Sequence, residues 1–333
     1  MKNLSILFLP VLSFSCSAYY DVPQAVTENG TRISVKLTDK ATSAEQDKEY
    51  TADIFVFDDD RLQRLDSYQR IRCRPGEMPS AASQNGKKII AAIINPQSDS
   101  YGWDHISSFQ ALQNEVADLK KETGHGMLMS GVGYVEAGKD AVCDISISAL
   151  AAEVQLRSLR CDFSGKPYQE SAIKDVKAYL TNVNAVAKIL QKDGFSPETL
   201  CNQGGLVKDD VLAFADRDLI VRKIGNEVGS QTVYPDISLI CYPNECMEET
   251  AGSPFTRLVI EGRINGQTCY YPININRDGR SGTGISRNCR YIFDVTLKST
   301  GSSDPDTAVS PADIDIACLI APWDEKDNTE IIF

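Results

Sequence analysis

Short segments in which apolar and polar residues alternate, separated by turn residues, are the feature of this sequence that most constrains its fold. In the segment 31–37, Ile33, Val35 and Leu37 alternate with polar residues, which is typical of a strand with one buried face. Alternating or fully apolar runs predict further strands at 51–57, 87–94, 127–135, 142–147, 151–163, 233–242, 255–264, 268–275, 290–299 and 313–321. Roughly a dozen short strands, with a turn about every 8–12 residues, indicate an all-β protein of the sandwich type.

The rest of the chain contains few helical signals. Residues 107–122 are predicted as a helix, because apolar residues recur there every three or four positions and Ser107 or Ser108 is suited to cap its start. The segment 173–190 fits a helix and a strand equally well, and 191–232 is predicted as a long loop with short helical turns. At 333 residues the chain is long enough for two sandwiches, and the cleanest boundary between them lies at 146–151.

The N-terminus has the pattern of an export signal. Lys2 provides a positive charge, and 4–12 is an apolar stretch too short to span a bilayer. Small residues precede Cys16, as at the processing site of bacterial lipoproteins, where the cysteine is acylated and becomes the first residue. Residues 1–15 are therefore predicted to be a signal peptide and Cys16 a lipidation site, with ordinary signal cleavage as the alternative.

The composition argues against several classes of function. The chain has 34 Lys and Arg against 46 Asp and Glu, a formal net charge of −12, so it is a poor candidate for binding nucleic acid. Its two histidines leave little basis for a histidine metal site or a catalytic base. Its paired acidic residues are neighbours in the sequence, unlike the separated carboxylates of a glycosidase, and 58–60 is predicted as a solvated turn rather than a calcium loop. We expect no enzyme activity, no metal and no cofactor.

Ten cysteines leave the redox state of the protein open. Their density is low for a disulfide-stapled scaffold, and if Cys16 carries lipid the remaining nine cannot all pair within one chain. Cys241 and Cys246 flank a turn-like segment across which a disulfide can form. Buried thiols that act as small apolar side chains are the equally supported alternative.

The segment 313–320 near the C-terminus alternates in the same way as 31–37. It places Ile314, Ile316, Cys318 and Ile320 on one face, after a Ser/Asp/Pro-rich linker at 301–311. Burying each isoleucine is worth about 1.5–3 kcal/mol, so this strand is suited to complete the sheet of another subunit in place of 31–37. The alternative is that it simply pairs within its own chain.

Three groups of motifs resemble one known family. They are the segment 27–37 followed by 51–58; the segments 241–244, 256–262 and 270–273; and the closing series 285–291, 301–306 and 321–324, which contains Arg287-Asn288-x-x-Tyr291 and Ala321-Pro322-Trp323. In their order and spacing they resemble the type V pilins of Bacteroidetes, the fimbrillin family of major and minor fimbrial subunits. The similarity covers nearly the whole chain after the predicted signal.

The resemblance implies two transthyretin-like antiparallel β-sandwich domains, here 16–147 and 148–333, the second ending in donor strands at 312–333. It also implies export as an outer-membrane lipoprotein, cutting by a trypsin-like surface protease in the loop after the first strand, and growth of a cell-surface fimbria by donor-strand exchange with other fimbrial subunits. The first strand to be displaced then carries Ile33, Val35 and Leu37, and the donor strands carry Ile314, Ile316, Cys318, Ile320, Ile331 and Phe333.

One departure concerns the cut. Family members are cut after Arg, whereas the loop 39–50 contains Lys40 and Lys48 and no Arg; these two lysines are the candidate processing sites. If neither is cut, the chain is instead an unprocessed anchor or tip subunit. A further alternative is a monomeric surface lipoprotein that binds carbohydrate, in which Trp103 or Trp323 stacks on a sugar.

Overall fold

The fold is known from a computed structural model, which describes residues 30–39, 49–74, 76–97, 102–123, 126–190, 199–246, 249, 254–277 and 284–323. Strands dominate these residues and helices are short, which confirms the prediction of an all-β protein with minor helices. Within the described residues, no helix has the length and apolar character needed to cross a membrane.

The strands of the first half are β1 (Gly30–Asp39), β2 (Tyr50–Asp58), β3 (Leu65–Cys73), β4 (Ser80–Gln84), β5 (Gly86–Ile94), β6 (Val116–Asp118), β7 (Met129–Ala137) and β8 (Ala141–Ala149). Those of the second half are β9 (Ala152–Cys161), β10 (Ile173–Thr181), β11 (Val183–Asn184), β12 (Val186–Lys188), β13 (Leu200–Cys201), β14 (Val221–Val228), β15 (Ile237–Cys241), β16 (Arg257–Ile264), β17 (Gln267–Asn274), β18 (Cys289–Leu297) and β19 (Ile314–Pro322). The α-helices are α1 (Phe109–Gln113) and α2 (Lys208–Ala213), and three 3₁₀ turns lie at Trp103–His105, Leu119–Lys121 and Arg217–Leu219.

The first half forms one folded sheet, here called the N-terminal sandwich, in the order β3-β2-β5-β7-β8-β1-β4. Strands β7 and β8 pair only at Met129–Ala149 and Ser130–Ser148, and the sheet turns over there into two layers that enclose an apolar core. Gly131 of β7 makes this close approach feasible, since a Cβ atom on it would lie 2.4 Å from the Ser146 carbonyl oxygen of β8.

The second half forms a C-terminal sandwich from two separate sheets, in the orders β14-β10-β16-β17 and β15-β9-β18-β19. Its pairing repeats that of the first half. Strand β9 is antiparallel to β15 and parallel to β18, as β1 is to β4 and β8, and β10 lies between β14 and β16 as β2 lies between β3 and β5. Within these main sheets β19 is an addition: beside β8, the described residues contain no strand that corresponds to it.

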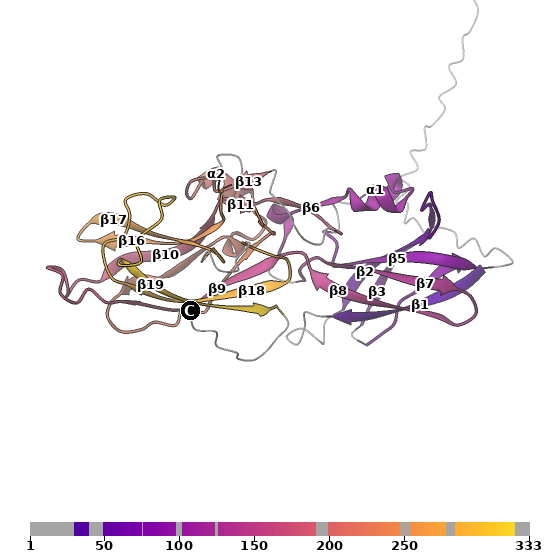
Figure 1. Ribbon diagram of the computed structural model, residues 1–333, viewed down its shortest axis with the longest axis horizontal. Coiled ribbons are helices and arrows are strands. Elements are labelled where there is room, and N and C mark those ends of the chain that lie inside the picture. Colours follow the sequence, from indigo (N-terminus) through magenta and orange to yellow (C-terminus); the bar gives the residue numbers. More distant parts are fainter. Residues whose placement is uncertain are drawn as a thin grey trace, which may run out of the picture.

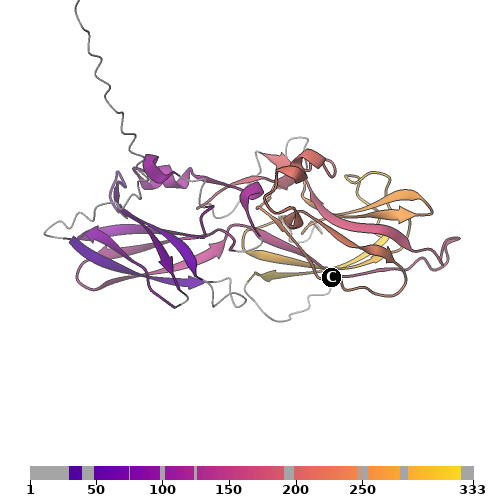
Figure 2. The same ribbon diagram turned by 180° about the vertical axis from the view of Figure 1, so that it is seen from behind.

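The two sandwiches lie end to end in an elongated molecule (Figures 1 and 2). Side chains and backbone join them. Strand β6 of the first half pairs with β12 of the second, and Arg287 donates to the carbonyl oxygens of Ser148 and Ala149. At the same junction the buried Tyr242 hydroxyl donates to Glu122 Oε1 at 2.8 Å. Strand β8 ends at Ala149 and β9 begins at Ala152; the division into domains at 147 and 148 stays a prediction.

The predicted helix at 107–122 is wrong over most of its length. Helix α1 covers only Phe109–Gln113, capped by Ser108, whose side chain accepts a hydrogen bond from the Ala111 N–H. The residues that follow pair as β6 with β12 instead of continuing the helix. Most of the apolar residues that form this periodicity are nevertheless buried, although Val116 is 44 % exposed. Phe109 and Leu112 pack over the face of the β2–β5 sheet that points away from the core of the sandwich.

Other segments bear on the remaining sequence-based expectations. Residues 173–190, which fit a helix and a strand equally well and which the family resemblance favours partly as strand, form β10, β11 and β12. Residues 199–232 contain the short helical turns that were expected, but 221–228 is a strand, β14, not a loop. Its pairing with β10 shifts register between Val176 and Lys177, which breaks the alternation on which a strand prediction depends. The polar edge strands β3 and β4 were not predicted at all.

Candidate assembly site

The N-terminal strand β1 lies between two strands of one layer, with β4 on one side and β8 on the other. Residues Gly30–Ser34 pair antiparallel with β4, and Ile33–Asp39 pair parallel with β8. Strand β1 is therefore an internal strand of its layer and not an edge strand. The space that β1 fills between β4 and β8 is here called the β1 groove.

The face of β1 that points into the sandwich is apolar, as the alternation predicted. Ile33 and Val35 are completely buried, and Leu37 packs partly buried against the same core. The intervening Arg32, Lys36 and Thr38 are exposed. Full burial of the two inner residues contributes about 1.5–3 kcal/mol each, so most of the affinity of β1 for its groove comes from this face and from its backbone hydrogen bonds.

Side-chain contacts of β1 with its neighbours are few. Thr31 donates to the Gly138 carbonyl oxygen at 2.6 Å, and Arg32 to the Ser80 hydroxyl at 3.0 Å. The ion pair of Lys36 with Asp144 is largely exposed to solvent, and such pairs contribute little. Among the described residues, the polar side chains of β1 thus add little to what its buried face and its backbone hydrogen bonds contribute.

The outer wall of the groove, β4, is held independently of β1. The Asp66 carboxylate of β3 accepts hydrogen bonds from the Ser83 hydroxyl at 3.0 Å and from the Gln84 N–H at 2.9 Å. The Ser67 hydroxyl donates to the Ala82 carbonyl oxygen. Because these bonds join β4 to the opposite layer, we expect β4 to keep its place when β1 is absent.

A buried lysine supports this wall. Lys88 of β5 is 2 % exposed, and its Nζ lies 2.6 Å from Asp58 Oδ1 and 2.7 Å from Asp66 Oδ2. Burial alone lowers the pKa of Lys88 and raises that of Asp66, but the hydrogen bonds between them outweigh burial, so the pKa of Lys88 is raised and that of Asp66 is lowered. Both groups are thus stabilised in their charged forms where β3, β4 and β5 meet.

At the other end of the chain, β19 lies at the edge of its sheet and pairs only with β18, from Ile314–Leu297 to Pro322–Cys289. Of its apolar face, Ile314 is buried, Ile316 is 37 % exposed, and Cys318 and Ile320 are partly buried against the core. The strand thus pairs within its own chain, which is the alternative that the sequence left open. It is held on one side, whereas β1 is held on both.

The linker before β19 is fixed at its start. Ser302 and Tyr270 exchange backbone hydrogen bonds, and Asp306 accepts from the buried Arg257 at 2.5 Å and from Asn182 at 2.9 Å. Residues 307–312 that follow are mostly exposed. A change in the position of β19 therefore needs to involve only the backbone after Asp306.

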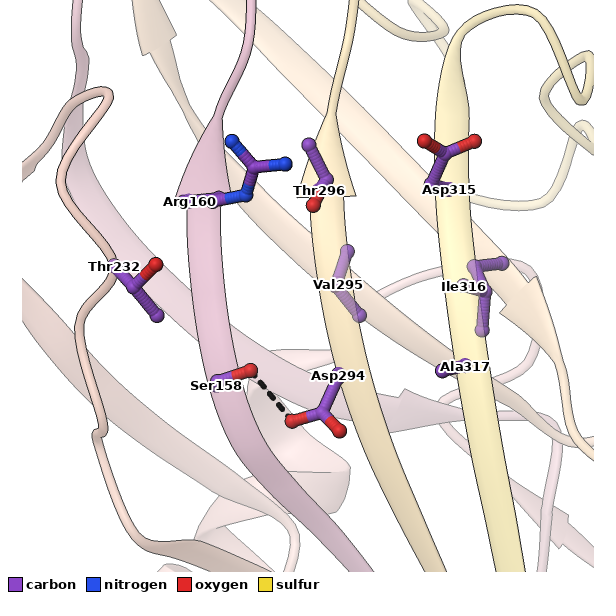
Figure 3. Close-up of a pocket in the computed structure, with 9 residues that line it drawn as sticks. All are labelled: Ser158, Arg160, Thr232, Asp294, Val295, Thr296, Asp315, Ile316 and Ala317. Atoms are coloured by element: carbon purple, nitrogen blue, oxygen red, sulfur yellow. Dashed lines mark hydrogen bonds between the residues drawn. The ribbon is translucent and has the colours of Figure 1, made fainter. Parts of the chain in front are cut away.

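A hollow of about 390 Å³ lies on the outer face of the sheet that contains β19 (Figure 3). Its floor is polar: Asp294 of β18 accepts from the Ser158 hydroxyl at 2.5 Å and from the Arg157 guanidinium. The bonds from Arg157 lower the pKa of Asp294. The Asp294 carboxylate of the lining is thus compensated by Arg157, which lies beside the hollow. Across the ranges that the structure describes, no cluster of His, Cys, Asp and Glu is suited to hold a metal.

Other predicted residues take structural positions. Trp103 is buried and donates to Asp53 at 2.9 Å, so it presents no ring for stacking on a sugar. The nine described cysteines, including Cys241 and Cys246, form no disulfide with one another. Asp60 accepts from the N–H groups of Leu62 and Gln63, as expected of a turn. The lipidation site, the processing sites and the last donor residues lie outside the described residues: Cys16, Lys40, Lys48, Ile331 and Phe333.

The sequence reasoning identified the inner face of β1 but not the walls of its groove. Strand β4 has the sequence Ser80-Ala81-Ala82-Ser83-Gln84, with no β-branched or aromatic residue to mark it as a strand. Cys143 of β8, which is 1 % exposed and lies opposite Val35, was part of a predicted strand but had no assigned role. Its position opposite Val35 follows only from the register between β1 and β8.

Comparison with known proteins supports the fold and little else. No protein-family model and no curated protein sequence matches the chain. Among solved structures, a candidate cell adhesion protein from Bacteroides eggerthii is similar with a TM-score of 0.63 and 17 % identity, covering 89 % of this chain and 96 % of the other.

Two proteins of Porphyromonas gingivalis are also similar. A fimbrilin (FimA) from strain W83 has a TM-score of 0.60 at 12 % identity, with 90 % of this chain and 99 % of the other covered. The tip fimbrial protein Mfa3, solved with a C-terminal truncation, has a TM-score of 0.53 at 12 % identity, with coverage of 88 % and 100 %. The chain thus has a fimbrillin-type fold, and these similar structures are fimbrial and cell-adhesion proteins, in line with the expectation of a non-enzymatic protein.

Proposed function

We propose that this protein is a structural subunit of a cell-surface fimbria, which assembles with other fimbrial subunits by exchanging strands. The fimbrillin-type fold supports the structural role. The observation that carries the proposal is the position of β1. This N-terminal strand buries Ile33 and Val35 completely and lies between β8 and β4, and β4 is held to β3 by contacts that do not involve β1.

Removal of β1 has a defined consequence. It uncovers the inner core beside Cys143 and Ile145 and leaves the facing edges of β4 and β8 without hydrogen-bond partners. An apolar groove flanked by two unpaired strand edges is a binding site for another extended strand with the same alternation. The occupant that we propose is the C-terminal strand of another subunit, with Ile314, Ile316, Cys318 and Ile320 facing the core, followed by Ile331 and Phe333.

The rest of the pathway follows from the same proposal. The chain is exported with the signal peptide 1–15, is lipidated at Cys16 and reaches the outer membrane. A trypsin-like surface protease then cuts after Lys40 or Lys48, between β1 and β2, which frees β1 to leave with the lipid anchor. The donor strand is available because β19 has one paired edge and a partly exposed apolar face, and therefore leaves its sheet more easily than β1 does.

The experiment uses the chain without its signal peptide, treated with a limiting amount of trypsin. We expect a new N-terminus after Lys40 or Lys48, read by mass spectrometry, and a ladder of oligomers on a gel of unheated samples. A variant with both lysines replaced, Lys40→Ala and Lys48→Ala, serves as the matched control and is expected to stay uncut in this loop and monomeric. A second variant that ends at Asp313 is expected to be cut but not to form a ladder by itself.

Two outcomes would lead to different conclusions. If the loop is resistant and the chain stays monomeric, the unprocessed anchor or the monomeric carbohydrate-binding lipoprotein replaces the proposal. If the loop is cut but no ladder forms, even when β1 is shown to have dissociated, the chain is a terminal subunit such as a tip protein.

A further inference from the structure

The inner faces of β1 and β19 share one pattern of side-chain size. On β1 the smallest residue, Val35, lies between the larger Ile33 and Leu37. On β19 the smallest of the central three, Cys318, lies between Ile316 and Ile320. Close-packed cores accept replacements of similar volume best, and they resist an added methylene as much as a missing one.

This pattern selects one register for a donor strand. With Cys318 in the place of Val35, Ile316 and Ile320 take the places of Ile33 and Leu37. The match holds whether the donor runs parallel or antiparallel to β1, because a large–small–large pattern reads the same in both directions. A shift by two residues in either direction would force an isoleucine into the space of Val35.

The residue opposite this place is a cysteine. Val35 of β1 is paired in register with Cys143 of β8. On its other side Cys143 is packed tightly by β7, since a Cβ atom on Gly133 would lie 2.7 Å from the Cys143 sulfur. The sulfur thus has little room on the side of β7.

The distances suit a covalent link. Neighbouring strands of a sheet lie about 4.7–4.9 Å apart, within the range of about 4.4–6.8 Å that separates the two Cα atoms of a disulfide. While β1 is in place, burial and, to a smaller extent, Asp144 raise the pKa of the Cys143 thiol to about 11, so the thiol is protonated and unreactive. Displacement of β1 removes the cover from this thiol.

We propose that Cys318 of an incoming donor strand lies directly opposite Cys143 in the β1 groove, and that the two thiols form a disulfide that locks the subunits together. The inference rests on the proposed function, because it requires the donor strand to occupy the groove. The oxidant is a small disulfide such as oxidised glutathione. One cysteine thiolate attacks it and releases one reduced glutathione, and the second cysteine then displaces the other glutathione from the mixed disulfide, with its own proton lost to solvent.

The experiment separates assembly from cross-linking. Trypsin-treated chains are assembled in two parallel samples, one with excess reductant and one with oxidised glutathione present throughout, so that the oxidant reaches Cys143 before the donor strand covers it. We expect the ladder to form under reducing conditions, to survive heating in detergent only after oxidation, and to collapse again on reduction. Peptide mapping of the oxidised ladder is expected to give a linked pair that contains Cys143 and Cys318.

Single variants test the assignment of the two residues. Cys143→Ala and Cys318→Ala are each expected to assemble under reducing conditions and to lose the heat-resistant ladder completely. Cys73→Ala changes another buried thiol that contacts the same core, and is expected to retain it. To test the register, Ile316→Cys and Ile320→Cys are each combined with Cys318→Ala, and neither is expected to link to Cys143.

The outcomes are distinguishable from those of the proposed function. A ladder under reducing conditions that never becomes heat-resistant overturns the disulfide and leaves strand exchange intact. A link from Cys143 to position 316 or 320 overturns the register. If no ladder forms under reducing conditions in any variant, the exchange of strands between copies of this chain and the disulfide that depends on it are both overturned.

Discussion

Lys88 shows how one residue supports a wall of the β1 groove. Its ammonium group is shared by Asp58 and Asp66, and Asp66 in turn holds the end of β4. Loss of Lys88 leaves the buried Asp66 carboxylate without its cationic partner, with hydrogen bonds from Ser83 and Gln84 alone among the described residues.

We therefore expect Lys88→Met to reduce the free energy of unfolding by about 3–5 kcal/mol at pH 7. The pKa of Asp66 is lowered in the folded state, so its contribution is present above the unfolded pKa of about 3.9 and is lost as the pH falls through the folded pKa. The difference between wild type and variant should shrink towards pH 2.

Urea unfolding at several pH values measures this difference. Lys87→Met, at the exposed neighbouring position, is the matched control and should change stability by no more than about 0.5 kcal/mol. A constant difference between pH 7 and pH 2 would contradict the role assigned to the ion pair.

At the scale of elements, β1 and β19 differ in how firmly each is bound. Both present alternating apolar residues, yet β1 has two neighbours and completely buried inner residues, whereas β19 has one neighbour and Ile316 partly in solvent. The same sequence pattern thus corresponds to one strand that is paired along both edges and to one that is paired along a single edge.

Truncation of equivalent residues measures this asymmetry. Ile33→Ala is expected to cost about 2–5 kcal/mol of stability, as for isoleucines in a tight core, whereas Ile316→Ala should cost about 1 kcal/mol or less because its side chain is 37 % exposed. Urea unfolding monitored by circular dichroism gives both values. Equal costs would mean that β19 is held as firmly as β1 and is not preferentially released.

The sequence predicted the elements with a strong apolar pattern and missed those defined by their neighbours. The inner strands, such as β2 and β5 with their runs of Ile, Val, Phe and Ala, were identified because a strand that is buried on both faces needs apolar residues at nearly every position. The edge strands β3, β4 and β14 carry polar residues that suit many conformations, and the sheet alone makes them strands. For the same reason the sequence identified the inner face of β1, while its pairing with Cys143 depends on register between distant segments.

At the scale of the whole molecule, the junction between the sandwiches contains a buried carboxyl group. Glu122 is 3 % exposed and accepts a hydrogen bond from Tyr242, which comes from the other half of the chain. Burial raises its pKa, although the hydrogen bonds from Tyr242 and its other neighbours act in the opposite direction.

The raised pKa predicts a pH dependence of stability. Because the folded pKa lies above the unfolded value of about 4.3, the unfolded chain loses this proton first as the pH rises, and the native state loses relative stability through that interval. Glu122→Gln keeps the hydrogen-bond acceptor without the charge. It should therefore gain stability over wild type at pH 8, on the order of 1 kcal/mol, and little at pH 4.

Thermal unfolding of both proteins at pH 4 and pH 8 measures this shift. Glu136→Gln, which changes an exposed glutamate on β7, is the control. Its unfolding temperature should equal that of the wild type at both pH values. A variant less stable than wild type at pH 8 would mean that the ionised Glu122 stabilises the junction.

Within the main sheets of the two sandwiches, the repeated topology leaves β19 without a counterpart among the described strands. A copy that has lost β1, as proposed, has an empty β1 groove in one sandwich and the extra strand β19 in the other. In a row of such copies, each groove is filled by the β19 strand of a neighbour, except in the copies at the two ends of the row. A fibre built this way is therefore directional, and its two ends differ chemically. One end carries an open apolar groove, and the other carries a β19 strand that no groove binds.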